Sequence, residues 1–205
     1  MNLAINALIE TRASTTRYQP GRELPEALIR QLVQLATCAP SAYNLQNWKF
    51  IAVHSAQAKT RLHALAYEQR QVLDASVTFI VCGTLAAHHG LAQALQPSVE
   101  AGILLPWLVD SWVNAASTAH MDNPQLQRDE ALRSASLAAM TLMLAAQGMG
   151  LASGAMSGFD SEGVAGAFGL TANELPVMLV TIGYPTAGNW PQKVRKPLGE
   201  VLAFA

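Results

Sequence analysis

The sequence predicts one α/β or α+β domain in which helices cover a single sheet. The chain has 205 residues and 51% of them are hydrophobic, so one domain has enough apolar surface for a core. Short runs rich in β-branched and aromatic residues alternate with longer segments of helical periodicity, as in a sheet sandwiched between helices. The continuous apolar run Pro176–Tyr184 is typical of a central strand buried on both faces.

Apolar residues recur at helical spacing along much of the chain. In Leu24–Thr37, for example, Pro25 stands in the first turn, where a missing N–H group costs nothing. The predicted helices are Asn2–Thr11, Leu24–Thr37, Ala56–Arg70, Leu85–Gln96, Ser98–Ala115, Arg128–Gln147 and Phe159–Phe168.

The remaining segments predict strands and loops. The predicted strands are Trp48–His54, Ser76–Gly83, Pro176–Tyr184 and a short strand after Gly148. The stretch Cys38–Asn47 is polar and predicts a loop. Proline and glycine recur from Pro185 to the end, so we expect residues 1–184 to form the domain and Pro185–Ala205 to be an irregular arm of it.

The segment Ser134–Ser157 raises the question of a membrane span, because its 24 residues carry no charge and about 20 suffice to cross a bilayer. It is polar at several positions, however, and Gly148 and Gly150 interrupt its second half. Glycine commonly ends a helix. We therefore expect a buried helix that ends at Gly148 and no membrane span.

Charged residues are scarce. They make up 13% of the chain and leave a formal net charge of −1. The high apolar share excludes global disorder, and the near-zero charge argues against a general nucleic-acid binder, which needs a basic surface. So few charges indicate either an oligomer with a large apolar interface or an alanine-rich monomer, and composition leaves both open.

Cys38 and Cys82 stand far apart in apolar surroundings. Without metal-ligand spacing, such a pair fits buried thiols in a reducing compartment better than a disulfide. The start, Met1–Asn6, has no basic residue and no apolar block behind it. We therefore expect no signal peptide and a cytoplasmic protein.

Basic residues are placed unevenly along the chain. No Lys or Arg occurs between Arg133 and Lys193, and then Lys193, Arg195 and Lys196 come within four residues. Such a cluster either binds an anion or forms a solvated tail. A second candidate is Arg12–Arg17, where guanidinium groups flank hydroxyl side chains that suit a phosphate. Alternatively, arginine there only complements a helix C-terminus.

Several motifs of nucleotide, nucleophile and metal sites are absent from the sequence. It has no G-x-G-x-x-G after a strand and no P-loop, and Ser157 stands one position late for a G-x-S-x-G elbow. His88 and His89 are adjacent, so we expect their side chains to point in different directions on a helix. We expect no metal site and no nucleophile–base pair.

One segment is specific to a protein family. Ala39–Phe50 reads APSAYNLQNWKF and resembles the A-P-S-x-x-N-x-Q-P-W-x-F signature of the FMN-dependent nitroreductase family. Further segments between residues 12 and 198 resemble that family's motifs in the same order. They are the R-x-S of Arg12–Ser14, the strand entry Leu73–Ser76, the flavin loop Gly150–Asp160, and the ending formed by Ile182–Pro185 and Lys193–Leu198.

This resemblance implies an α+β fold: a nitroreductase-like three-layer sandwich with a central mixed sheet and helices on both faces. It also implies an intertwined homodimer in which each of two FMN molecules contacts both chains. Such an interface would account for the low charge, and the arm Pro185–Ala205 would pack on the partner chain. NADH or NADPH would be the electron donor.

The resemblance assigns the cofactor-binding residues in four groups. One group holds the phosphate, the partner chain lines the ring and ribityl chain, an amide contacts the pyrimidine edge, and backbone N–H groups face the flavin O4–N5 edge. The phosphate group consists of Arg12, Ala13, Ser14, Lys193 and Arg195, and the group that lines the ring and ribityl chain consists of Pro40, Ser41, Ala42 and Asn44. The pyrimidine edge is assigned to Gln69, with Glu68 or Gln71 beside it. The flavin O4–N5 edge is assigned to Met156, Ser157 and Gly158. No side chain need act as acid or base, because the cofactor carries the chemistry.

Two residues depart from the family pattern. Asn47 replaces the usual proline, and Thr16 stands where a cation near flavin N1 and O2 is usual. Arg17 comes one residue late, so we expect it to point elsewhere.

The implied function is the reduction of small acceptors, such as nitroaromatics or quinones, by a ping-pong mechanism. Reduction of an enal or semialdehyde, or flavin binding without catalysis, are the alternatives. We expect the acceptor mouth to lie in Ser98–Gln127, where Trp107 and Trp112 either line it or pack in the dimer interface.

Overall fold

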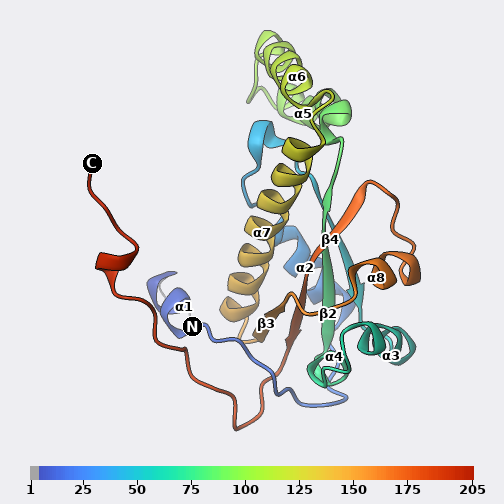
Figure 1. Ribbon diagram of the computed structural model, residues 1–205, viewed down its shortest axis with the longest axis vertical. Helices are drawn as coiled ribbons and strands as arrows, with labels where there is room; N and C mark the ends of the chain where they lie inside the picture. The colour runs from blue at the N-terminus through green and yellow to red at the C-terminus, as the bar shows by residue number, and fades with distance from the viewer. Residues whose placement is uncertain (1–4) are drawn as a thin grey trace.

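The computed structural model describes residues 5–205, and Figure 1 shows their arrangement. The start of the expected helix Asn2–Thr11 lies outside the described residues. The helices and helical turns are α1 Ile5–Thr11, α2 Glu26–Ala36, η1 Ala42–Asn44, α3 Ala56–Leu65, α4 Gln71–Asp74, η2 Ala87–Gly90, α5 Leu91–Glu100, α6 Pro106–His120, α7 Pro124–Gly148, α8 Ser161–Ala167 and η3 Leu198–Glu200. The strands are β1 Trp48–Val53, β2 Val77–Thr84, β3 Ala152–Met156 and β4 Glu174–Gly183.

The four strands form one sheet in the order β1-β2-β4-β3. β4 contains most of the apolar run Pro176–Tyr184 and is central, as that run predicts. All three ladders are antiparallel, so the expectation of a mixed sheet is wrong for the described residues. Neighbouring strands of the sheet therefore run in opposite directions. Within the described residues, a parallel pairing occurs at the isolated bridge between Ser14 and Ser153.

Helices pack on both faces of the sheet, which confirms the three-layer α+β architecture. Alternate residues of β2 point to opposite faces, as in any strand. Val77, Phe79 and Val81 pack with α2 and α7 in one core, whereas Ile80 and Cys82 pack with α3, α4 and α8 in the other. In Figure 1 the long helix α7 runs along one face, and α3, α4 and α8 lie beyond the opposite one.

The chain leaves the sheet after β2 and forms an excursion, residues 86–120, that stands beyond one end of the sheet (Figure 1). A single helix was expected over Ser98–Ala115, and this is wrong. α5 ends at Glu100, Gly102 takes a φ of 70°, and α6 begins at Pro106. Pro106 lies in the first turn of α6, where proline is well tolerated.

Several other helix boundaries also differ from the expected ones. α3 ends at Leu65 rather than near Arg70, because Tyr67 and Glu68 adopt the left-handed conformation. α7 begins at Pro124, four residues before the expected start at Arg128. The Asn123 side chain accepts a hydrogen bond from the Leu126 N–H and caps this helix.

The residues after β4 form an irregular arm with one short helical turn, η3. In Figure 1 this arm passes α1 and then runs away from the rest of the chain. Between Ile5 and Ala205, no helix combines the length and the apolar character needed to cross a membrane.

Candidate functional site

The segment Arg12–Arg17 lies directly against the edge strand β3. The Thr15 N–H donates to the Ser153 carbonyl oxygen at 2.9 Å, and Ser14 bridges Ser153. The approach is so close that a Cβ on Gly154 would collide with the Thr15 carbonyl oxygen. A glycine at position 154 is therefore a condition for placing this segment.

The side chains of Tyr18 and Asn189 hold the same segment from its other sides. The buried Tyr18 hydroxyl contacts Thr181 Oγ1 at 2.9 Å and donates to the Thr15 carbonyl oxygen at 3.2 Å. Burial raises the pKa of this hydroxyl, which keeps it protonated. Asn189 Oδ1 accepts from the N–H groups of Thr16 and Arg17, both at 2.9 Å. Sequence reasoning missed both side chains, because neither belongs to a family motif.

The predicted phosphate-binding residues line one hollow of about 280 Å³. Its walls are formed by Arg12, Ala13, Ser14, Pro191, Gln192, Lys193 and Arg195. Gln192 Nε2 donates to the Arg12 carbonyl oxygen at 3.2 Å and so ties the arm to the end of α1. Among the described residues, no carboxylate lines this hollow, and neither Arg12 nor Lys193 nor Arg195 forms an ion pair. Three free cations thus meet from opposite ends of the sequence.

A second hollow, of about 870 Å³, continues from the other end of the same segment. Thr16, Gln69 and Gln71 line it, whereas Glu68 does not. Arg17 also lines it. The guanidinium lies against Gly188, where an added Cβ would be only 2.9 Å from Nη1.

The loop after β3 reaches the same place. Gln69 Nε2 donates to the Gly158 carbonyl oxygen at 2.8 Å, so Gln69 joins the second hollow to this loop. Met156 is buried, while Ser157 and Gly158 are exposed. The structure therefore brings Thr16, Gln69 and Gly158 together from three separate parts of the chain.

The segment Pro40–Asn47 lies elsewhere. It packs against the excursion, and neither hollow includes any of the predicted residues Pro40, Ser41, Ala42 and Asn44. Tyr43, Asn44 and Gln46 have φ values of 51°, 56° and 48°. Such left-handed backbone costs about 1–3 kcal/mol per residue and persists where the surroundings enforce it.

The long helix α7 separates the two predicted halves of the site. At its start, Gln127 Nε2 donates to the His120 carbonyl oxygen, near Pro40–Asn47. At its end, Gln147 Nε2 donates to Thr11 Oγ1, next to Arg12. These glutamines are 20 residues apart, which is about 30 Å along a helix. Within one chain the two predicted halves do not meet.

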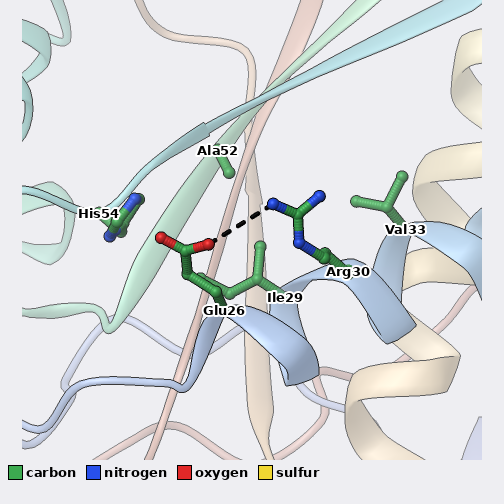
Figure 2. A pocket seen from close by; sticks show the side chains of 6 residues that line it. All are labelled: Glu26, Ile29, Arg30, Val33, Ala52 and His54. Carbon is green, nitrogen blue, oxygen red and sulfur yellow. Dashed lines mark ion pairs between the residues drawn. The ribbon is translucent and has the colours of Figure 1, made fainter.

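A third hollow, of about 1030 Å³, lies between α2 and the end of β1 (Figure 2). Glu26 and Arg30 approach each other there at 3.5 Å, and His54 stands across from them. Both charged side chains are more than two-thirds exposed, at 71% and 80%, so the pair contributes little stability. None of the predicted site residues lines this hollow, and we do not assign it to the cofactor.

The histidines and cysteines offer no alternative chemistry in the described part of the chain. The rings of His88 and His89 lie 4.1 Å apart between centroids, closer than expected for adjacent residues, because they share the tight turn η2. Between Ile5 and Ala205, no three His, Cys, Asp or Glu side chains are arranged to hold a metal ion. Burial raises the pKa of the Cys82 thiol to about 12, so Cys82 is a poor nucleophile.

Comparison with known proteins identifies the family. The sequence pattern of the Nitroreductase family matches residues 9–184. The chain belongs to this family. It is 32% identical over 176 residues to YodC of Bacillus subtilis, named as an NAD(P)H nitroreductase, with 86% of this chain and 87% of that protein covered.

Two further comparisons concern the fold and the substrate. The crystal structure of a protein named as a nitroreductase, in complex with FMN, from Exiguobacterium sibiricum matches with a TM-score of 0.92. Its identity is 28%, and 99% of this chain and 98% of that chain are covered. The CLA biosynthesis enone reductase of Lactiplantibacillus plantarum is 26% identical, with 89% of this chain and 87% of that protein covered. The resemblance to the family and its implied three-layer α+β fold are thereby confirmed.

Proposed function

We propose that this chain is an FMN-dependent NAD(P)H oxidoreductase that reduces small organic acceptors, and that two copies of it build each flavin site. Membership in the nitroreductase family gives the enzyme class. The FMN complex of the Exiguobacterium protein and the NAD(P)H in the name of YodC support the cofactor and the electron donor. When bound, FMN supplies the transfer of two electrons between the nicotinamide and the acceptor.

The observation that carries the proposal is the hollow lined by Arg12, Lys193 and Arg195. A phosphate monoester is a dianion, and three cations without ion pairs in an acid-free hollow suit it. Arginine adds a planar fork of donors for phosphate oxygens. The Ser14 hydroxyl, on the same wall, can donate beside them. The residues present therefore fit the phosphate of FMN.

The second hollow would take the polar edge of the ring. Gln69 stands between this hollow and Gly158, so its amide and the backbone N–H groups of Ser157–Gly158 can serve adjacent edges of a flat heterocycle. Arg17 and Arg70 bring positive charge to the same wall, although Asp74 binds Arg70 Nε at 3.1 Å. These residues bind and orient, and none of them has to transfer a proton.

The separation of the predicted residues supports a site made by two chains. Pro40–Asn44 packs near the start of α7 and Arg12–Ser14 lies near its end, so one chain supplies two half-sites. In a homodimer, the Pro40–Asn44 segment of one protomer would cover the flavin that its partner holds by the phosphate. Two such sites would form by symmetry.

The arm also supports a dimer. Val194, Leu198 and Phe204 are 98%, 73% and 92% exposed, which leaves the arm with little contact to its own chain. A run of exposed apolar residues is typical of a surface that binds a partner. We propose that Pro185–Ala205 packs on the partner chain. The interface would then belong to the obligate class, roughly 2,000 Å² or more in total.

Two classes of acceptor are supported. The name of YodC favours nitroaromatics, with quinones as related two-electron acceptors. The enone reductase relative favours an activated carbon–carbon double bond, the class to which the enal alternative belongs. In either case the donor and the acceptor would use the flavin in turn, by a ping-pong mechanism. Trp112 packs against Tyr43 at 6.5 Å between ring centroids, whereas Trp107 is 65% exposed and is the better candidate for the acceptor mouth.

The thiols support a reducing, cytoplasmic location. Both cysteines are free; Cys82 is buried as expected, whereas Cys38 is exposed, so the expectation of a buried thiol is wrong there. An exposed free thiol persists best where the compartment keeps it reduced.

The test begins with the absorption spectrum of the purified protein, which should show bound flavin that denaturation releases as FMN. NADH and NADPH are then added separately without oxygen. An enzyme loses its flavin colour rapidly and regains it when an acceptor is added, which allows nitroaromatics, quinones and enones to be compared. Flavin that stays coloured with both nucleotides would instead identify a protein that binds FMN without using it.

A further inference from the structure

Three buried polar atoms without hydrogen-bond partners meet at one small cavity beside the segment Pro40–Asn47. They are Asn47 Oδ1, His88 Nδ1 and His120 Nε2. The exposed fractions of these residues are 2%, 4% and 4%. Buried polar groups are normally paired, so three unpaired atoms around one cavity are an unusual concentration.

The cavity joins three parts of the fold. Asn47 ends the strained segment, His88 lies at the start of the excursion, and His120 lies at its end. Gln127 of α7 binds both ends: its Oε1 accepts from the Ala86 N–H at 3.1 Å and its Nε2 donates to the His120 carbonyl oxygen at 2.8 Å. The Gln127 side chain therefore links the first and last residues of the excursion.

The same excursion holds the segment in its left-handed conformation. Leu45 is buried in a cluster with Leu91, Leu95, Val109 and Ala116 of the excursion. Tyr43, whose φ is 51°, stands edge-on to Trp112 of α6. Backbone of this kind persists only where its surroundings fix it, and here the surroundings are α5 and α6.

The chemistry of the three atoms depends on one proton. His120 Nδ1 lies 2.8 Å from the Ala116 carbonyl oxygen, which can only accept. In the neutral ring Nε2 is then an acceptor, like Asn47 Oδ1. No hydrogen bond joins these three atoms, so the contacts that keep the neutral His88 ring in the cavity are those of packing. A second proton on His88 would put a charge in a buried site.

We propose that Asn47, His88 and His120 form a positioning device for the flavin-facing segment, closed while His88 is neutral and opened when His88 takes up a proton. The proposal rests on the proposed flavin site, because it makes the excursion the support of Pro40–Asn44. Opening would release the excursion and the left-handed segment together, and the FMN that the segment covers would dissociate faster.

The charged and titratable groups around His88 favour opening as the pH falls. Burial lowers the pKa of His88, and the neighbouring rings of His89 and His120 lower it further. His120 stacks on His88 at 5.5 Å between centroids. Glu130 of α7, the carboxylate on the cavity wall, is held by Arg133 at 2.6 Å. A group with a lowered pKa stabilises the closed form above its ordinary pKa, and this stabilisation is lost as the pH falls.

Hydrogen exchange measured by mass spectrometry tests the device on the whole protein. Protection of residues 41–47 and 87–120 is compared at about pH 7.5 and about pH 5.5, corrected for intrinsic exchange. We expect both segments to lose protection together by up to about tenfold, because the opened histidine has its ordinary pKa of about 6.5. The sheet strands β2 and β4 should keep their protection.

The decisive variant is His88→Asn, whose side chain is polar but does not titrate. This variant should lose the acid response in both segments, and the control His54→Asn, on the distant end of β1, should keep it. An acid response that survives in His88→Asn, or a response in residues 87–120 without residues 41–47, would overturn the proposal. If His88→Asn does not fold, His88→Gln replaces it.

Release of FMN gives a readout that a purely structural histidine would not move. Acidification should accelerate the release from the wild-type holoprotein in proportion to the loss of protection, and should not do so in His88→Asn. If the protein binds no FMN, the proposed function fails while the exchange measurement still decides whether the device exists.

Discussion

The two loop segments that we assign to one cofactor, Arg12–Arg17 and Pro40–Asn47, differ in the contacts that hold them. Arg12–Arg17 is fixed by backbone bonds to β3 and by the side chains of Tyr18 and Asn189. Pro40–Asn47 is fixed by apolar packing against the excursion, with three residues in left-handed conformation. The first segment carries charge for a phosphate, whereas the second offers a surface for a flat ring. In our proposal, this difference means that one chain supplies both a phosphate-binding segment and a ring-covering segment, but needs a partner chain to complete either site.

The largest effect is expected from Gly154→Ala. The added Cβ would collide with the Thr15 carbonyl oxygen and come within 3.1 Å of Thr181 Oγ1. Since the obstacle is backbone, the segment must move away from β3, and we expect a loss of several kcal/mol in unfolding free energy. Thermal unfolding measures this loss, and FMN binding should fall with it.

The matched control for this substitution is Gly166→Ala in α8, where no atom lies within 4 Å of the new Cβ. Alanine in a helix interior stabilises by about 0.5–1 kcal/mol relative to glycine. Equal effects at both positions would show that the approach of Arg12–Arg17 to β3 is not required.

The next prediction separates binding of the FMN phosphate from binding of the flavin ring. Arg195→Ala removes one cation from the hollow and should weaken FMN binding by about 1.5–3 kcal/mol, the contribution of a charge-assisted hydrogen bond. That is roughly 10-fold to 150-fold in Kd. Riboflavin, which lacks the phosphate, should bind wild-type and variant alike in fluorescence titrations. An equal loss for the two ligands would contradict the phosphate assignment.

The sequence indicated the proposed phosphate-binding residues better than the contacts that position their segment. The spacing of basic residues singled out the segment Arg12–Arg17 and the cluster Lys193–Lys196. The family resemblance chose Arg12, Lys193 and Arg195 among them, and the structure places these three on one hollow. Asn189 gave no signal, because a single amide in a proline-rich arm has no periodicity. Its role depends on tertiary contacts with the backbone of Thr16 and Arg17.

The fold shows the same limit. Apolar runs predicted the strands and most helices, since burial on the sheet sets their spacing. The break between α5 and α6 was missed although Gly102 and Pro106 were visible, because the apolar periodicity continues across them. Asn47 was placed in a polar loop, and only the packing of the excursion buries it.

The smallest effect is expected from Thr16→Lys. A cation beside the flavin stabilises its reduced form by about 1 kcal/mol at ~4 Å in a water-like surrounding and up to about 4 kcal/mol near a protein surface. This range corresponds to roughly 20–90 mV for a two-electron couple. Arg17 already lines this open hollow, so we expect an increase in potential near the lower end.

Potentiometry on the wild type and on Thr16→Lys measures this shift, with FMN affinity as the control that should stay similar. A potential that does not change would mean that Arg17 already fulfils the role of the missing cation.

Mixed dimers test most directly whether each flavin site combines the phosphate-binding residues of one chain with the segment Pro40–Asn44 of its partner. Chains carrying Arg195→Ala and chains carrying Asn44→Gly, which keeps the left-handed backbone, are co-expressed with different tags and the mixed dimer is isolated. If the site is shared, one site collects both defects and the other none, so we predict one tightly bound FMN per dimer. Two weakened sites, each carrying one of the two defects, or a monomer that retains flavin, would contradict the account.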